Sequence, residues 1–194
     1  MNPLKSILGT IISGFVLAVI IMAVVSGENA NPALAVTVWL HVIAGVVWIG
    51  LLYYFNFVQV PGMAPAKADG TAAGISKHIA PRALLWFRWG AVATWITGAA
   101  ALAKLGDGGF VNAFTFAAGW EVIGVGAWLG TIMLFNVWVL IWPNQKKVLG
   151  MVEASDAEKA KAGTVALMAS RTNTLLSIPM LMSMTAFGHG GFPF

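Results

Sequence analysis

Five apolar runs, each long enough to cross a lipid bilayer, constrain the fold of this chain more than any other feature of its sequence. A membrane-spanning helix needs about 20 predominantly apolar residues. The runs occupy residues 7–25, 35–58, 83–103, 119–142 and 172–188. Only 9% of the 194 residues are charged, whereas soluble domains carry roughly 25%. The sequence therefore predicts an all-α integral membrane bundle of five transmembrane helices that form one domain.

The segments between the runs are rich in Gly, Pro and charged residues, and we expect them to be loops at residues 59–82 and 143–171. Within the second loop, residues 151–163 read as a short solvated helix. Ser155 would cap this helix and Glu158 would complete a capping box. The first apolar run exceeds the roughly 7–15 residues of a signal-peptide core, so we expect it to be a retained helix.

The basic residues predict how the bundle is oriented. Lys and Arg in short loops favour the cytoplasmic side of a membrane. If the N-terminus is cytoplasmic, all eleven basic residues except Lys104 lie on the inner side. We therefore expect a multi-pass protein of the bacterial inner membrane with a periplasmic C-terminus. Because the charges flank apolar runs and do not gather on one soluble face, nucleic acid is not an expected partner.

The chain contains no cysteine, which excludes disulfides, thiolate-bound iron–sulfur clusters and covalently attached c-type haem. The sequence also has no Walker motif, no G-x-G-x-x-G loop and no nucleophile elbow. Nucleotide-dependent and hydrolytic chemistry are therefore not supported. Any metal or cofactor would have to use His, Met, carboxylate or amide groups.

Three helices place polar residues in the outer half of the predicted bundle. His41, Gly45 and Trp48 fall at i, i+4 and i+7 and so share one helix face. This arrangement predicts a haem b, with His41 as an axial ligand, Gly45 leaving room and Trp48 packing on the ring. His189 is the expected second metal ligand, and Glu121 the carboxylate that accepts a hydrogen bond from a ligating histidine.

Simpler roles remain open for each of these residues. His41 can be a buried histidine that bonds a backbone carbonyl, with Gly45 present only for helix packing. Glu121 can be an interfacial carboxylate. Copper binding or proton handling through His41, Glu121 and Met184 is a lesser alternative to haem, because methionine more often fills gaps in a core.

A second set of polar side chains gathers at the inner ends of the predicted helices and forms a candidate substrate or anion pocket. Its members are His78, Arg88, Asn136, Asn144, Arg171 and Asn173. Together these groups could bind a planar anion or haem propionates, because Arg pairs with carboxylates through two parallel hydrogen bonds. The alternative is that they cap helix ends, extend to the interface or contact anionic lipid headgroups.

Small residues recur every fourth position in two of the predicted helices. Gly126 and Gly130 form a G-x-x-x-G pattern, and Gly90, Thr94 and Gly98 continue the same spacing in another helix. Such patterns favour close contact between membrane helices.

Four segments resemble the membrane domain of the bacterial membrane-bound urate oxidases. They are "HVIAGVVWIGLLYYFNFVQ" (41–59), "WFRWGAVATWITG" (86–98), "LGTIMLFNVWVLIWPNQKK" (129–147) and "SRTNTLLSIPMLMSM" (170–184). More loosely, "WLHVIAGVVWIG" is similar to the opening helix of the membrane-embedded protoporphyrinogen oxidases, which bind haem b through such a histidine. The first resemblance implies a cytoplasmic substrate and a periplasmic electron acceptor.

Members of that family that oxidise urate carry a cytochrome c domain after the last span, whereas these 194 residues hold no C-x-x-C-H motif. The resemblance thus implies a separate acceptor such as a cytochrome c. We expect a haem b-binding electron-transfer or oxidoreductase protein, with the inner cluster as its substrate or quinone-like site. The alternative is a cofactor-free accessory subunit that packs against a larger energy-transducing membrane complex.

Overall fold

The computed structural model describes residues 2–25, 27 and 31–192, and every regular element within these ranges is a helix. The chain divides into two compact units, Met1–Pro32 and Ala33–Phe194. Each unit is described by itself. The predicted all-α class is confirmed for the described residues.

The first unit holds a 3₁₀ turn, η1 (Pro3–Lys5), and helix α1 (Ile7–Val25). Asn2 caps the turn, because its side-chain oxygen accepts a hydrogen bond of 2.9 Å from the Leu4 backbone N–H. Helix α1 coincides with the first predicted span, and its residues are almost all apolar.

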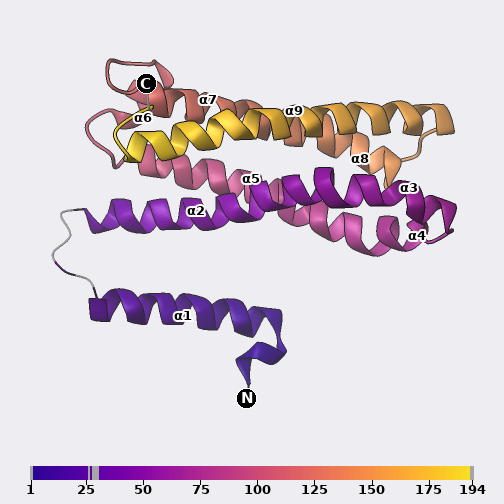
Figure 1. Ribbon diagram of the computed structural model, residues 1–194, viewed down its shortest axis with the longest axis horizontal. Helices are drawn as coiled ribbons and strands as arrows, with labels where there is room; N and C mark the ends of the chain where they lie inside the picture. Colours follow the sequence, from indigo (N-terminus) through magenta and orange to yellow (C-terminus); the bar gives the residue numbers. More distant parts are fainter. Residues whose placement is uncertain (1, 26, 28–30, 193–194) are drawn as a thin grey trace. The chain divides into compact units, whose positions relative to one another are not determined.

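The second unit is a bundle of helices, some of them joined end to end through π-helical turns (Figure 1). Its elements are α2 (Pro32–Tyr53), η2 (Tyr54–Gln59), α3 (Val60–Ala68), α4 (Ala72–Gly74), η3 (Ile75–Ile79), α5 (Ala80–Leu102), α6 (Gly109–Phe114), α7 (Glu121–Phe135), η4 (Asn136–Ile141), α8 (Trp142–Val148) and α9 (Asp156–Gly188). The turns η2, η3 and η4 are the π-helical ones.

The two predicted loops are largely helical. The second predicted span continues through η2 and α3, so that one helical rod runs from Pro32 to Ala68. A second rod runs from Glu121 to Val148 through η4. The sequence suggested loops here because Pro, Gly and charged residues punctuate both segments. Pro61 and Pro143, however, stand in the first turns of α3 and α8, just after the π-helical turns η2 and η4, and a local π-helical adjustment allows a continuous helix to hold a proline.

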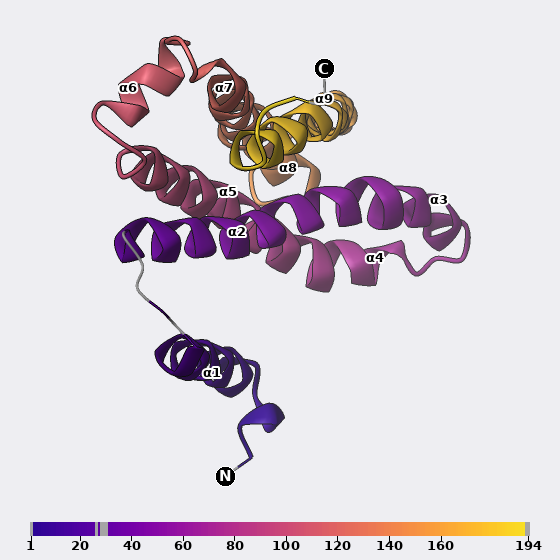
Figure 2. The same ribbon diagram turned by 60° about the vertical axis from the view of Figure 1, so that its left-hand side comes forward.

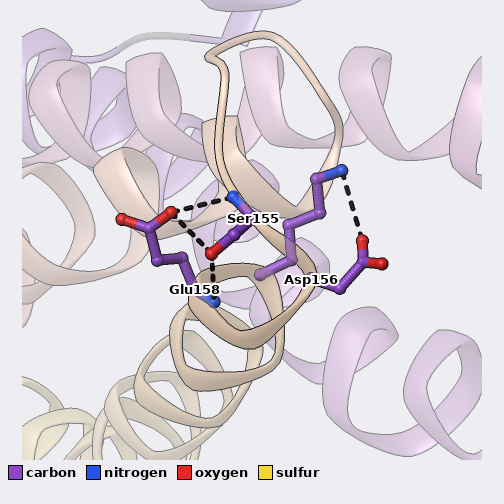
Figure 3. A network of polar contacts seen from close by, with 4 residues as sticks. Ser155, Asp156 and Glu158 are labelled. Atoms are coloured by element: carbon purple, nitrogen blue, oxygen red, sulfur yellow. Dashed lines mark hydrogen bonds and ion pairs between the residues drawn. The ribbon is translucent and has the colours of Figure 1, made fainter.

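Helix α9 begins at the predicted capping box and then continues for 33 residues. The Ser155 hydroxyl accepts a hydrogen bond from the Glu158 backbone N–H, and the Glu158 carboxylate accepts one of 2.8 Å from the Ser155 N–H (Figure 3). In the same turn, the Lys159 Nζ atom lies 3.8 Å from Oδ1 of Asp156. The capping box is therefore confirmed. The helix that it starts is not a separate short one, because it forms the first turns of α9.

Three helical segments among the described residues, rather than the predicted five, are long and apolar enough to cross a membrane. They are Ile7–Val25, Pro32–Ala68 and Glu121–Val148. The other two predicted spans lie in α5 and α9, which are helices of 23 and 33 residues. Arg88 and several Trp, Thr and Gly residues lower the apolarity of α5, and Ser, Thr and Asn residues lower that of α9.

The bundle has two ends of different chemistry (Figure 1). The start of α2, the loop between α5 and α7 and the last turns of α9 gather at one end, which we call the histidine end because it holds His41 and His189. The turns of α3, α4 and α8 and the start of α9 gather at the other, which we call the amide end. In Figure 2, α7, α8 and α9 lie on one side of α5, and the rod formed by α2 and α3 crosses the rod formed by α4 and α5.

Large side chains fill the bundle near its middle. The fully buried ones include Trp48, Leu52, Phe87 and Met133, which belong to one hydrophobic cluster drawn from α2, α5, α7, η4 and α9. A smaller cluster at the histidine end joins Leu102, Ala113, Ile123 and Ala127. These clusters fix how the helices meet and thereby position the polar side chains at each end.

Candidate functional site at the two ends of the bundle

His41 is half-buried and its imidazole is held by helix α5. Its Nδ1 lies 2.8 Å from the backbone carbonyl oxygen of Thr94. A carbonyl can only accept a hydrogen bond, so Nδ1 must carry the hydrogen and Nε2 keeps its lone pair. The Thr97 hydroxyl lies 3.5 Å from the same Nδ1. The bond to the Thr94 carbonyl fixes the orientation of the His41 ring and leaves Nε2 as the atom available to a metal or a proton.

The rest of the predicted His41 face packs directly against the small-residue stripe of α5. A Cβ atom built on Gly98 would lie 2.9 Å from His41 Cε1, and one built on Gly90 would lie 3.4 Å from the Trp48 backbone nitrogen. Between them, a Cβ atom built on Gly45 would lie 3.9 Å from the Thr94 methyl group, which is ordinary contact distance. The predicted close helix contact through Gly90, Thr94 and Gly98 is thus confirmed.

Two of the residues assigned to a haem ring have other roles in the structure. Gly45 faces Thr94 and does not open onto free space. Trp48 is 2% exposed and belongs to the hydrophobic core, where it packs with residues such as Leu52 and Phe87. Spacing along α2 placed the three residues on one face correctly, but it could not reveal that α5 covers that face.

Glu121 and His189 lie at the histidine end but make only local contacts. The exposed Glu121 carboxylate accepts a hydrogen bond of 2.8 Å from the Gly119 backbone N–H. The expected bond from His41 to Glu121 is therefore replaced by the one to Thr94. The exposed His189 donates from Nδ1 to the Thr185 carbonyl at 2.7 Å, which again leaves Nε2 with its lone pair. Both histidines are thus held in the same tautomer by backbone oxygens.

Among residues 2–25, 27 and 31–192, no three His, Asp or Glu side chains are grouped closely enough to hold a metal ion. A site of three such ligands is therefore not preformed in that part of the chain. Axial ligation of a haem uses at most two side chains, so this finding does not bear on a haem held by histidine.

The amide end contains a buried hydrogen-bonded pair that joins η4 to α9. Asn136 donates from Nδ2 to Asn173 Oδ1 at 2.8 Å, and Asn173 donates to the Met133 carbonyl at 2.9 Å. Asn173 has no exposed surface and Asn136 only 8%. The structure therefore brings together two of the six residues predicted to line an inner pocket, and their amides are occupied by each other and by the backbone.

A parallel set of contacts joins η2 to α9. Asn56 donates to the Leu52 carbonyl at 2.9 Å and to the Ser170 hydroxyl at 2.8 Å. One turn away, Tyr53 and Ser177 are joined by a hydrogen bond of 2.9 Å, and Ser177 donates in turn to Thr174. Tyr53 and Ser177 were not among the predicted site residues, because neither differs from an ordinary helix residue in sequence.

The π-helical turns explain why side-chain amides gather here. A π-helix bonds i to i+5, so the change from the α pattern leaves backbone carbonyls open to other donors. The Leu52 and Met133 carbonyls lie just before η2 and η4, and each accepts a side-chain amide. The Met133 carbonyl accepts the Asn136 backbone N–H as well. We refer to Asn56, Asn136, Ser170 and Asn173 as the amide cluster.

The remaining predicted pocket residues do not join this cluster. Arg88 is half-buried and lies over the ring of Trp142, with its Cζ atom 3.8 Å from the ring centroid. Asn144 donates to the Leu140 carbonyl of its own helix at 2.7 Å. Arg171 and His78 are exposed. The inner residues therefore divide into a buried amide cluster and a set of basic groups nearer the surface.

Comparison with known protein families bears on the second half of the chain. The model of the family described as Urate oxidase N-terminal matches residues 108–192. This part of the chain resembles the urate oxidases. The match runs from α6 through α9 and includes Asn136, Asn173, Glu121 and His189, whereas His41 and Arg88 lie outside it. No curated protein and no solved structure matches the chain.

Proposed function

We propose that this protein is a urate oxidase-like membrane protein that binds haem b through His41 and passes electrons toward an acceptor at its histidine end. The hydrogen bond from His41 Nδ1 to the Thr94 carbonyl carries this proposal. It supplies the orientation and tautomer that a metal-ligating histidine needs. The family match over residues 108–192 supports the urate oxidase-like part.

The donor set fits a haem, although part of the expected pocket does not. His41 and His189 each hold Nδ1 against a backbone carbonyl and keep Nε2 as a potential axial ligand. Gly45 and Trp48 are not part of the proposal, because α5 covers them. Haem supplies one-electron chemistry when bound. In this chain Thr94 fixes the His41 ring, and Gly98 allows it to lie close to α5.

We further propose that α5 and α9 cross the membrane together with the three apolar segments, with the amide end in the cytoplasm. Arg88 and the polar groups of α9 are tolerated within a span when they face other helices, and Asn173 and Ser177 are fully buried. A reporter that fluoresces only in the cytoplasm should remain dark when it is fused behind α9. A bright reporter would show that the orientation is opposite to the one proposed.

The absorption spectrum of the purified protein tests the haem assignment. We expect a Soret band and a reducible α band in protein isolated from haem-sufficient cells. His41→Ala should abolish or shift these bands while the protein still inserts into the membrane. His78→Ala is the matched control, because His78 is exposed at the amide end. If the wild-type protein shows no such bands, the cofactor-free accessory subunit becomes the better description.

A further inference from the structure

Two basic residues share one tryptophan ring at the amide end. Arg88 of α5 lies over Trp142 with its Cζ atom 3.8 Å from the ring centroid, and the Nζ atom of Lys146 lies 5.8 Å from the same centroid. Lys146 follows Trp142 by four residues in α8, so the two lie on one face of that helix. We call Arg88, Trp142 and Lys146 the cation–tryptophan cluster.

The two positive charges of this cluster have no acidic partner in the part of the chain that the structure describes. Among the described residues, neither Arg88 nor Lys146 lies within ion-pair distance of a carboxylate. The neighbouring Lys147 is different, because its charge acts on the Glu158 carboxylate of the capping box. In α8, only Lys146 lies over the tryptophan ring that Arg88 already covers. Bringing two like charges to one ring is unfavourable unless an anion lies beside them.

Arg88 is placed so that it can donate hydrogen bonds to such an anion. A guanidinium that stacks flat on an aromatic face keeps its N–H groups in the plane, where they remain free to bind an oxyanion. None of the Arg88 nitrogens is both buried and unpartnered in the described chain. Its donor edge is therefore accessible, and the ammonium of Lys146 can add a second contact to the same oxyanion.

Apolar surface adjoins the cluster on both helices. Leu85 and Trp89 of α5 are 44% and 54% exposed, and Val139 of η4 is 48% exposed. Tryptophan and basic side chains at the end of an apolar rod are typical of the boundary between the bilayer and water. A ligand held by Arg88 and Lys146 would thus have its charged part at the cluster and apolar chains along these residues.

We propose that the cation–tryptophan cluster binds the phosphate of an anionic phospholipid headgroup. The adjoining apolar surface favours a lipid over a small soluble anion, since a soluble anion would use only the two cations. The proposal depends on the membrane placement described above and is independent of haem. It assigns Arg88 and Lys146 a ligand of their own, separate from the buried amide cluster.

Lipid retention during purification tests this proposal. The protein would be reconstituted with equal parts phosphatidylglycerol and phosphatidylcholine and re-extracted in mild detergent, and the retained lipids would be quantified by mass spectrometry. We expect the wild-type protein to retain phosphatidylglycerol preferentially. Arg88→Gln and Lys146→Gln should each reduce this preference about fivefold, the usual contribution of one basic residue near an anionic membrane surface.

Conservative and neighbouring variants make the test specific. Arg88→Lys keeps the charge but loses the planar stack, so the preference should fall although less than in Arg88→Gln. Lys146→Arg should keep it. Lys147→Gln is the matched control and should retain phosphatidylglycerol like the wild type, because Lys147 is the adjacent lysine of α8 and is not one of the two cations over the Trp142 ring.

Three results would overturn the assignment. The first is an equal loss in Lys147→Gln, which would indicate only general charge attraction. The second is an unchanged preference in the Arg88→Gln, Lys146→Gln double variant, shown to be folded by its thermal melting. The third is stabilisation of the detergent-solubilised protein by inorganic phosphate to the same extent as by phosphatidylglycerol. Loss of the Soret band would leave all of these readouts unaffected, so the two proposals can fail separately.

Discussion

The two ends of the bundle use polar side chains in different ways. At the amide end, Asn136 and Asn173 bond each other and a backbone carbonyl, and both are buried. At the histidine end, His41 and His189 each use one ring nitrogen to bond a carbonyl and keep the other. The first arrangement consumes its hydrogen-bonding capacity within the protein, whereas the second retains an unused lone pair on each ring.

This difference separates stabilising polar groups from reactive ones. A buried polar group that is fully satisfied joins helices and specifies how they pack. A histidine that is held by one nitrogen and open at the other can bind a metal or move a proton. Polarity inside a membrane bundle is therefore a weak indicator of function until the partner of each donor and acceptor is known.

If the amide cluster serves packing, removing it should cost stability. Asn173→Ala would leave Asn136 Nδ2 without its acceptor and the Met133 carbonyl without its side-chain donor. We expect a loss of about 1–3 kcal/mol, the range for leaving a buried polar group unpaired. The measurement is the unfolding transition in detergent. Thr172→Ala is the matched control, because Thr172 is the exposed neighbour on the same helix. Equal effects of the two substitutions would show that the buried pair contributes little.

At the histidine end, substitutions of two glycines can distinguish the observed packing against α5 from the expected arrangement, in which Gly45 leaves room for a haem. A Cβ at Gly98 would come within 2.9 Å of the His41 ring, whereas a Cβ at Gly45 would meet only the Thr94 methyl group at 3.9 Å. Gly98→Ala should therefore displace the ring, cost about 1–3 kcal/mol and alter any haem spectrum. Gly45→Ala should be tolerated in both thermal melting and absorption. If Gly45→Ala had the larger effect on melting and absorption and Gly98→Ala were tolerated, Gly45 would again be the residue that makes room for a cofactor.

The smallest expected effect concerns the first turn of α9, beside the amide end. Hydrogen bonds from the backbone N–H and hydroxyl of Ser155, with the charge of Lys147, hold the pKa of the Glu158 carboxyl below its ordinary value of 4.5. A carboxyl whose pKa is lower in the folded state stabilises the fold above its unfolded pKa. This contribution is lost as the pH falls through the lowered value.

The free energy of unfolding of the wild type should therefore fall on acidification below about pH 4.5, relative to that of Glu158→Gln. The glutamine can keep the capping box but cannot titrate. Paired urea or thermal unfolding from pH 6 to pH 3 measures the difference. A difference between the two proteins that does not vary with pH would argue against this role of the carboxylate.

Much of the fold could be predicted from the sequence because long apolar helices are defined by composition. The described helices include all five predicted segments, and the capping box of Ser155 and Glu158 follows from spacing alone. The continuity of Pro32–Ala68 and Glu121–Val148 could not be predicted. Prolines in the first turn of a helix look the same in sequence as prolines that end one.

The sites were harder to predict because they depend on contacts between helices. Periodicity placed His41, Gly45 and Trp48 on one face, but the partner of that face is a stripe on α5. Nor does spacing indicate that Arg88 would lie over Trp142, since 54 positions separate the two residues in the chain. The residue types in the sequence indicated which positions were candidates for a site. Which side chain or carbonyl each of them contacts became known only from the packing of the helices.

The turn η4 has a consequence for how this chain can change by insertion and deletion. A π-helical turn holds one more residue than the α-helical turn that it replaces. Deleting one residue, such as the exposed Val139, would allow the rod from Glu121 to Val148 to close into continuous α-helix. Because the deletion removes the extra residue, α8 would keep its orientation relative to α7. A substitution that turned η4 into α-helix without a deletion would instead rotate α8 by about 100° and turn Trp142 and Lys146 away from Arg88. The extra residue in η4 thus adjusts the angular phase between α7 and α8, and the chain can lose that residue by a single deletion and still keep Trp142 facing Arg88.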